Sequence, residues 1–202
     1  MTTAQNTVRG VLDGRRYPEY SLEEREHLQR AKSAYAAYAG HLWFREGDHE
    51  TGLDYIRAEL RRHIRETGVR PVVLIDYLQL MTSTLRTDNR VLVISEITRQ
   101  LKIMAKEMDV PVILLSQLSR APEGRKDKRP MLSDLRESGS IEQDADIVLF
   151  LYRDAYYNKE SPTPNISECI VAKNRHGNTG TVKMIWDGQF TRFSNMEMQH
   201  ET

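Results

Sequence analysis

Two polar side chains follow apolar segments at points where strands should end. Residues 72–81 read VVLIDYLQLM, with Asp76 directly after four aliphatic residues, and residues 110–117 read VPVILLSQ, which ends in Ser116 and Gln117. The carboxyl ends of neighbouring parallel strands meet at one edge of a sheet, so we expect Asp76 and Gln117 to lie together. An aspartate at such an edge holds the magnesium ion of a bound nucleotide, and an amide senses its γ-phosphate.

Each of these two signals is weak when it stands alone. An acid after an apolar strand is most often the start of a loop, and a glutamine at a strand end is most often solvated. Together they favour a nucleotide site in which Asp76 follows a strand buried on both faces. Its partner should be a glycine-rich loop ending in Gly-Lys-Ser/Thr, which cradles the phosphates. The 202 residues contain no Gly-Lys pair, and the nearest match, Gly47 to Gly52, carries two acids and continues with Leu53.

A third group of candidate residues lies in and after a polar loop expected at 118–131. Arg136 could meet phosphates, and Gly139 would let a backbone N–H approach one closely. The loop itself adds the cations Arg120, Arg125, Lys126, Lys128 and Arg129. Charge alone favours a solvated surface loop, because acids dilute the run. Aromatic residues for base stacking are missing, which argues for contacts to a nucleic-acid backbone.

Lys173 and Arg175 form the fourth candidate, at the end of a strand-like run that opens a glycine turn. Alternate residues of an extended segment project to the same side, so the two cations should act together. Such a pair suits insertion into the phosphate site of a neighbouring subunit. Without the strand before Asp76, a basic surface hairpin would be the preferred interpretation. His176 has no second histidine or cysteine at ligand spacing, so a metal site there is weakly supported.

The elements that must position these residues begin with a helix. Ser21 to Glu24 forms a capping box, and the helix should end at Gly40, with Tyr35 and Tyr38 as packing residues. Residues 41–45 read as a short strand.

Further along, apolar periodicity predicts helices over 53–67 and 89–109, and apolar runs predict strands within 72–76, 110–117 and 147–152. A short polar helical stretch should lead to Ala145. Strands are expected at 168–174, 180–186 and 189–193, the last two joined by a hairpin turn at Asp187-Gly188. This order indicates one α/β domain with a mostly parallel sheet flanked by helices and a C-terminal antiparallel hairpin.

Composition sets further bounds on the protein. Its 29 basic and 29 acidic side chains cancel, so a nucleic-acid site would have to be a local patch. The single cysteine, Cys169, excludes an internal disulfide, fits a reducing cytosol and is expected to be a buried hydrophobe. No signal-like start and no run of roughly 18 apolar residues is present, which predicts a soluble cytoplasmic protein without a membrane partner.

Four blocks, DYLQLM, LKIMAKEMDVPVILLSQLSR, RPMLSDLRESGSIEQDADIVLFLYRD and AKNRHGNTGTV, together resemble the C-terminal ATPase domain of DnaB-type replicative DNA helicases. The resemblance covers residues 69–195, whereas residues 1–68 match it poorly. It implies a RecA-like P-loop fold and a hexameric ring around single-stranded DNA, with ATP and Mg²⁺ between subunits. It further implies 5′-to-3′ translocation, duplex unwinding, and a helicase loader and primase as partners; the polarity does not follow from the residues themselves.

The resemblance assigns roles to the candidate residues. Asp76 becomes the magnesium carboxylate and Gln117 the γ-phosphate sensor. Lys173 and Arg175 become a basic pair that reaches the ATP of the next subunit. The loop that holds the DNA backbone corresponds to Arg136, Glu137 and Gly139.

Departures from the family pattern lead to a narrower expectation. The family's phosphate loop and the strand with its catalytic glutamate precede the region at which this sequence starts, and Asn178 stands where the family has proline. We therefore expect a truncated or split helicase ATPase core that hydrolyses little ATP by itself. A non-catalytic module that binds DNA or enters a helicase ring is one alternative. A RecA-like recombination ATPase is another, although the DLRESGSIEQDAD block suits the helicases better.

Overall fold

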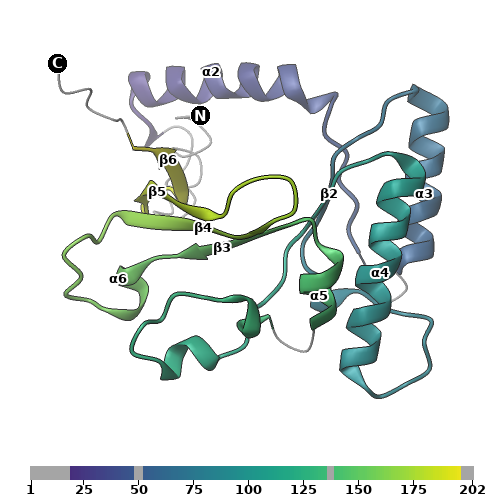
Figure 1. Cartoon of the computed structure of the whole chain (residues 1–202). Coiled ribbons are helices and arrows are strands. Elements are labelled where there is room, and N and C mark those ends of the chain that lie inside the picture. The colour runs from purple at the N-terminus through teal and green to yellow at the C-terminus, as the bar shows by residue number, and fades with distance from the viewer. Residues whose placement is uncertain (1–18, 48–51, 136–138, 197–202) are drawn as a thin grey trace. The chain divides into compact units, whose positions relative to one another are not determined.

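The computed structural model describes residues 19–47, 52–135 and 139–196 (Figure 1). Contacts within the chain divide it into two compact units. The first unit contains residues 1–46 and 185–202, and the second contains residues 47–184. In the described part of the chain, no helix has both the length and the apolar character needed to cross a bilayer.

The first unit contains helix α2 (Leu22–Ala39). The predicted capping box is present: the Ser21 hydroxyl accepts from the Glu24 N–H at 3.2 Å, and the Glu24 carboxylate accepts from the Ser21 N–H at 2.8 Å. The helix ends at Gly40, as predicted, but its only buried residue is Leu28. Tyr35 and Tyr38 are 56% and 65% exposed, so the prediction that they pack was wrong.

The segment after α2 differs from its prediction. Residues 41–45 were expected to form a strand, but residues 42–47 have no regular structure, and no described segment pairs with them. Leu42, Trp43 and Phe44 are all at least 45% exposed. A strand needs a neighbour to satisfy its backbone N–H and C=O groups, and apolar side chains alone do not supply one.

The first unit also contains the end of the C-terminal hairpin. Strand β5 (Gly180–Asp187) is followed by strand β6 (Arg192–Asn195), its neighbour in the sheet. The turn begins at Asp187, as predicted, and the Asp187 carbonyl accepts from the Phe190 N–H at 3.3 Å. The Trp186 and Phe193 rings lie across the hairpin with centroids 4.7 Å apart.

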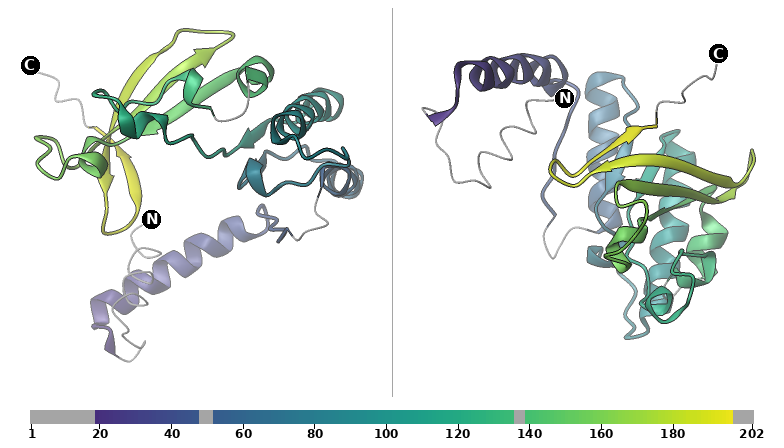
Figure 2. Two further views of the ribbon diagram at one scale, coloured as in Figure 1. Left: turned by 90° about the horizontal axis from the view of Figure 1, so that it is seen from below. Right: turned by 90° about the vertical axis from the view of Figure 1, so that its left-hand side faces the viewer.

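Two long helices form one side of the second unit. Helices α3 (Leu53–Thr67) and α4 (Arg90–Met108) lie side by side (Figures 1 and 2), and Arg57 on α3 donates to Gln100 on α4 at 3.3 Å. Gly68 ends α3 in the left-handed conformation with φ +70°, which glycine adopts without strain. The Asn89 side chain caps α4 by accepting from the Val91 and Leu92 N–H groups. The helix therefore begins where the sequence predicts.

The strands on either side of α4 are parallel. Strand β1 (Val73–Ile75) pairs with strand β2 (Val112–Leu114), with Val73 opposite Val112 and Ile75 opposite Leu114. The β1–α4–β2 unit therefore confirms the predicted βαβ connection. Four apolar residues of α4, Ile94, Ile97, Leu101 and Met104, are at most 4% exposed and form its buried face, whereas Val91 is 44% exposed and lies off that face.

The rest of the second unit is built on an antiparallel sheet. Strand β3 (Ile147–Tyr152) pairs antiparallel with strand β4 (Ile166–Asn174), and β5 follows β4 in the sheet order. The short helices α5 (Gly139–Asp144) and α6 (Asp154–Tyr157) flank β3 in the chain. Three 3₁₀ turns lie in loops, over Leu78–Leu80, Ala121–Gly124 and Leu132–Asp134. Cys169 lies in β4 but is half-buried, not buried as predicted.

One face of the strands packs on the helices and the other does not. Side chains such as Ile75 and Leu114 contact the core formed with α4, together with Val148 and Phe150 of β3. The alternate residues point away: Leu74 and Ile113, partners across the β1–β2 pair, are 63% and 50% exposed.

The alternate residues of β3 behave in the same way. Ile147, Leu149 and Leu151 are 54–59% exposed, whereas Val148, Phe150 and Tyr152 are buried. The prediction of a strand buried on both faces before Asp76 was therefore wrong for the described chain. Sequence showed that both faces are apolar, but apolar side chains are buried only if another element covers them, and none in the described part of this unit does.

Candidate functional site

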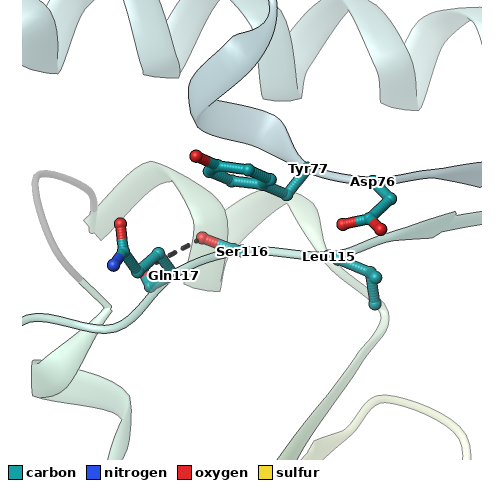
Figure 3. A pocket seen from close by; sticks show the side chains of 5 residues that line it. All are labelled: Asp76, Tyr77, Leu115, Ser116 and Gln117. Carbon is teal, nitrogen blue, oxygen red and sulfur yellow. Dashed lines mark hydrogen bonds between the residues drawn. The ribbon is translucent and has the colours of Figure 1, made fainter. Parts of the chain in front are cut away.

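Asp76 and Gln117 lie at the carboxyl ends of the two parallel strands, as predicted. The Leu115 N–H donates to the Ile75 carbonyl at 3.0 Å, and the Leu78 N–H donates to the Leu115 carbonyl at 2.8 Å, so the segments remain paired beyond the strands. A pocket of about 320 Å³ opens there. Its lining residues are Asp76, Tyr77, Leu115, Ser116 and Gln117 (Figure 3).

Two polar side chains of this pocket, those of Asp76 and Gln117, are available to a ligand. Asp76 and Gln117 are both exposed, and among the described residues no hydrogen bond or ion pair engages the Asp76 carboxylate. In Figure 3, Tyr77 and Ser116 lie between them. An exposed carboxylate suits a hard cation such as Mg²⁺, which usually keeps several water ligands and binds protein through one or two carboxylates. Over the described residues there is no cluster of three or more potential metal ligands.

Gln79 fixes the geometry of this pocket, and the sequence analysis did not single it out. Its side-chain Nε2 donates to the Ser116 hydroxyl at 3.1 Å and to the Gln117 carbonyl at 3.3 Å, while its Oε1 accepts from the Gln117 N–H at 3.2 Å. One amide therefore ties the segment after Asp76 to the segment that carries Gln117. In the sequence, the signal for this role was a polar residue between two apolar ones, Leu78 and Leu80.

α4 supports the same segment from its N-terminal end. The Arg90 guanidinium donates to the Gln79 carbonyl at 2.6 Å. Both the side chain and the backbone of Gln79 are therefore held, which restricts the loop that follows Asp76.

Lys173 and Arg175 lie outside this pocket, at the end of β4. They share one neighbourhood, as their alternation predicts: Lys173 Nζ donates to the carbonyls of Glu142 and Ala145, the latter at 2.8 Å, and Arg175 donates to the Gln143 carbonyl at 3.3 Å. Both cations therefore contact the C-terminal end of α5 in the single chain.

Gly139 is the first residue of α5, and Arg136 and Glu137 lie outside the described residues. A β-carbon placed on Gly139 would have no described atom within 4 Å beyond its chain neighbours. The packing of the described chain therefore does not require a glycine at this position. The candidate phosphate-loop match at 47–52 also falls largely on residues that are not described.

The basic loop before Gly139 is held by internal ion pairs. Arg125 makes a bidentate contact with buried Asp134, and Arg129 makes another with Glu168, with both N–O distances 2.7 Å. The Glu168 carboxylate is the main reason that the pKa of Arg129 lies above its ordinary value. The sequence favoured a solvated loop, but two of its five cations are held in ion pairs with Asp134 and Glu168. The pairing acids lie 9 and 39 residues away, so local charge counting did not reveal them.

The described residues fit part of a nucleotide site. Asp76 suits a magnesium ion and Gln117 suits a terminal phosphate, since an amide both donates and accepts. A phosphate cradle would need a glycine-rich loop and lysine, and the 202 residues contain no Gly-Lys pair. The pocket therefore carries a carboxylate and an amide that suit a cation and a phosphate, and no lysine or glycine is among its described lining residues.

Comparisons with known proteins place the chain in a family. Residues 9–195 match the family model described as DnaB-like helicase C terminal domain. The chain is 55% identical over 147 residues to the replicative DNA helicase DnaB of Geobacillus stearothermophilus. This alignment covers 72% of this chain and 32% of that protein. The Haemophilus influenzae helicase is 51% identical over 146 residues, covering 72% and 31%. The match thus spans about a third of the length of these relatives.

Solved structures show the same likeness. The ATPase domain of G40P has a TM-score of 0.82 and 42% identity, over 96% of this chain and 68% of that one. A DnaB-like replicative helicase, described with its interactions with primase, has a TM-score of 0.78 and 45% identity, over 89% and 43%. These neighbours share the RecA-like ATPase fold predicted from the four sequence blocks. The chain belongs to the family of DnaB-like helicase C-terminal domains.

Proposed function

We propose that this chain is part of a replicative DNA helicase that couples ATP hydrolysis to 5′-to-3′ translocation on single-stranded DNA and to duplex unwinding. The observation that carries the proposal is the shared position of Asp76 and Gln117, at the ends of paired parallel strands and in one pocket, within a chain of this family. The relatives that match it are named replicative DNA helicases.

ATP and Mg²⁺ are the cofactors that this pocket would take. Asp76 would bind the magnesium ion, through water or directly, and Gln117 would hydrogen-bond the γ-phosphate. Mg²⁺ supplies the neutralisation of phosphate charge when bound. Gln79 holds the Gln117 backbone, so it would set the position from which the sensor acts.

The remaining site residues would act between subunits and on DNA. Lys173 and Arg175 would reach the ATP of a neighbouring subunit in a homohexameric ring. Arg136, Glu137 and Gly139 would hold the single-stranded DNA backbone, with the cation contacting phosphate and the glycine allowing close approach.

The uncovered strand face supports a further part of the proposal. The exposed side chains of β1, β2 and β3 are aliphatic, and sheets with parallel strands are normally covered on both faces. The G40P ATPase domain extends well beyond the region that this chain matches. We infer that β1 and β2 belong to a larger, mostly parallel RecA-like sheet, completed by polypeptide that carries the phosphate loop. Because the family match runs from 9 to 195, both units would belong to that single domain.

Partners follow from the same family membership. One structural neighbour is described with its interactions with primase, so we propose a primase as a partner, together with a helicase loader. Action on replicating DNA would place the protein in the bacterial cytoplasm.

Hydrolysis assays test this function directly. The 202-residue chain should show no ATP hydrolysis above background, with or without single-stranded DNA, because its sequence contains no Gly-Lys pair to cradle the phosphates. The same chain should hydrolyse ATP when it is joined to the part of the G. stearothermophilus ATPase domain that precedes the matched region, here called the preceding half. DNA should stimulate that activity, and the stimulation should weaken with rising salt.

Variants of the joined protein identify the site. Asp76→Asn should abolish hydrolysis, whereas Asp109→Asn, which removes the charge of an exposed carboxylate at the C-terminal end of α4, should not. Hydrolysis by the isolated chain that depends on Asp76 would overturn the prediction that it lacks a cradle. A folded joined protein that binds DNA but never hydrolyses ATP would favour a non-catalytic DNA-binding or ring-interaction module.

A further inference from the structure

The short helix α5 is attached to α4 by a row of polar contacts. The Ser95 hydroxyl hydrogen-bonds the Ser140 hydroxyl at 2.9 Å, the Thr98 hydroxyl donates to Asp144 at 2.7 Å, and Lys102 pairs with Asp146 just beyond the helix. The three α4 residues are spaced by three and four, so they lie on one face. α5 is thus fixed along its length to α4. The first residue of α4, Arg90, in turn holds the Gln79 carbonyl.

The basic pair completes the C-terminal end of this helix. Lys173 binds two of the last carbonyls of the α5 segment, and Arg175 binds a third. Carbonyls at a helix C-terminus have no partner within the helix and carry partial negative charge, so cations stabilise them. In the single chain, Lys173 and Arg175 therefore satisfy groups of their own subunit.

Asp146 is the carboxylate at the centre of this arrangement. Its Oδ2 pairs with Lys102, and its Oδ1 lies 3.4 Å from the Arg175 guanidinium, while its backbone carbonyl accepts from the Arg175 N–H at 2.9 Å. The hydrogen bond from Lys102, together with the charges of Lys102, Arg175 and His176, keeps the pKa of Asp146 below its ordinary value. The carboxylate is thus charged at neutral pH and attracts Arg175.

We propose that Asp146 is a positioning residue for the basic pair, and that the C-terminal end of α5 and a polyphosphate compete for Lys173 and Arg175. The inference rests on the proposed function, because it concerns the pair that would reach a neighbouring nucleotide. When a phosphate draws the two side chains away, the α5 carbonyls and Asp146 lose their partners. Each contact of the basic pair is partly exposed, so breaking it costs little free energy and the exchange between α5 and phosphate should be reversible.

The exchange would also weaken α5. This helix has only six residues, so loss of the cations at its C-terminal end should make it open more often.

The experiment uses the 202-residue chain and inorganic tripolyphosphate as the probe, with binding followed by NMR at constant ionic strength. Asp146→Asn removes the competing charge, so we expect tripolyphosphate to bind roughly three- to fivefold more tightly, the equivalent of the strongest partly exposed ion pairs. The matched control is Asp144→Asn, which makes the same charge change two residues away, at a carboxylate directed to Thr98. It should leave the affinity close to that of the unchanged chain.

These outcomes separate a positioning role from a merely structural one. Structural damage would weaken binding, whereas the proposal predicts a gain. An equal gain in tripolyphosphate affinity in both variants would mean that the gain comes only from the loss of a negative charge nearby. No gain in a folded Asp146→Asn chain would show that Asp146 does not restrain the pair. Either result overturns the proposal. Arg175→Gln should weaken tripolyphosphate binding several-fold, which would confirm that the probe binds at the basic pair.

A second measurement needs no variant. In the unchanged chain, saturating tripolyphosphate should speed amide hydrogen exchange in residues 139–146 and leave the middle of α4 unaffected. Unchanged exchange in α5 while the Arg175 signals shift to saturation would overturn the competition. The proposed function is judged separately, by whether Arg175→Gln reduces DNA-stimulated hydrolysis in the joined protein, so failure of one proposal is distinguishable from failure of the other.

Discussion

The Arg125 guanidinium and the Asp134 carboxylate form two parallel hydrogen bonds, 2.7 and 2.6 Å long, in the loop before α5. Asp134 is only 1% exposed and also accepts from the Met131 N–H at 2.8 Å. Arg125 in turn donates to the Arg129 carbonyl at 2.8 Å. A loop rich in charge, proline and glycine is thereby closed around a buried carboxylate.

Replacing Asp134 should destabilise the chain. Asp134→Asn keeps the size of the side chain, but it removes the charge that pairs with Arg125 and replaces one acceptor oxygen with an NH₂ group. We therefore expect the free energy of unfolding to fall by roughly 1–3 kcal/mol. The control is Asp109→Asn, the same change at an exposed carboxylate 3.7 Å from Arg70, where a left-handed backbone tolerates asparagine. Urea unfolding compares the two variants. Equal losses would show that the buried pair contributes no more than a surface pair.

Acid should remove part of the same stability. Burial raises the pKa of Asp134, but the hydrogen bonds from Arg125 and Met131 and the charge of Arg125 outweigh it, so the pKa lies below its ordinary value. The pKa values of Asp127, Asp146 and Asp154 are also lowered. The main causes are hydrogen bonds that these carboxylates accept from the Arg129 N–H, from Lys102 and from the Ser161 hydroxyl, respectively.

The sign follows from proton binding. The unfolded chain takes up protons at a carboxyl pKa of about 4, before the folded chain does, so this stability is present above that pH and is lost as pH falls through the lower folded values. Urea unfolding between pH 7 and pH 3 should show a decline that begins below about pH 5. Asp134→Asn should make the decline shallower, and an unchanged slope would contradict the role given to Asp134.

Gln79 provides a third prediction. Gln79→Met keeps the length of the side chain but leaves the Gln117 N–H without its acceptor, so the chain should lose about 1 kcal/mol of stability and exchange the Gln117 amide faster. In the joined protein, hydrolysis should slow because the sensor is no longer held. Gln29→Met, at an exposed position of α2, serves as the control. Unchanged exchange at Gln117 would show that β2 alone positions it.

Much of this architecture could be predicted because its signals are local. The Ser21 capping box, the Gly68 helix end and the periodicity of α4 each depend on residues a few positions apart, and each was confirmed. The joint position of Asp76 and Gln117 followed from one general rule about parallel strands. The hairpin turn at Asp187 followed from its turn residues.

What the sequence did not reveal depends on distant partners. Nothing near Arg125 or Lys173 indicates that Asp134 and the end of α5 receive them, and Gln79 reads as an interruption in an apolar run until β2 is placed beside it. At Leu74 the sequence predicted a contact that the structure lacks. Its neighbours predicted burial on both faces, but burial depends on whether a second layer is present, which no pattern within the strand encodes.

Leu74 therefore allows a test of the proposed completion of the domain. Because its side chain is 63% exposed, Leu74→Ser should change the stability of the 202-residue chain by no more than about 0.5 kcal/mol. In the joined protein the preceding half should cover this face, and the same substitution should cost roughly 1.5–3 kcal/mol. Leu78→Ala is the control, since Leu78 is fully buried in the chain itself and should cost about 2–5 kcal/mol in both proteins. If Leu74→Ser costs equally little in a folded, ATP-hydrolysing joined protein, the second layer lies elsewhere and the uncovered face has a different occupant.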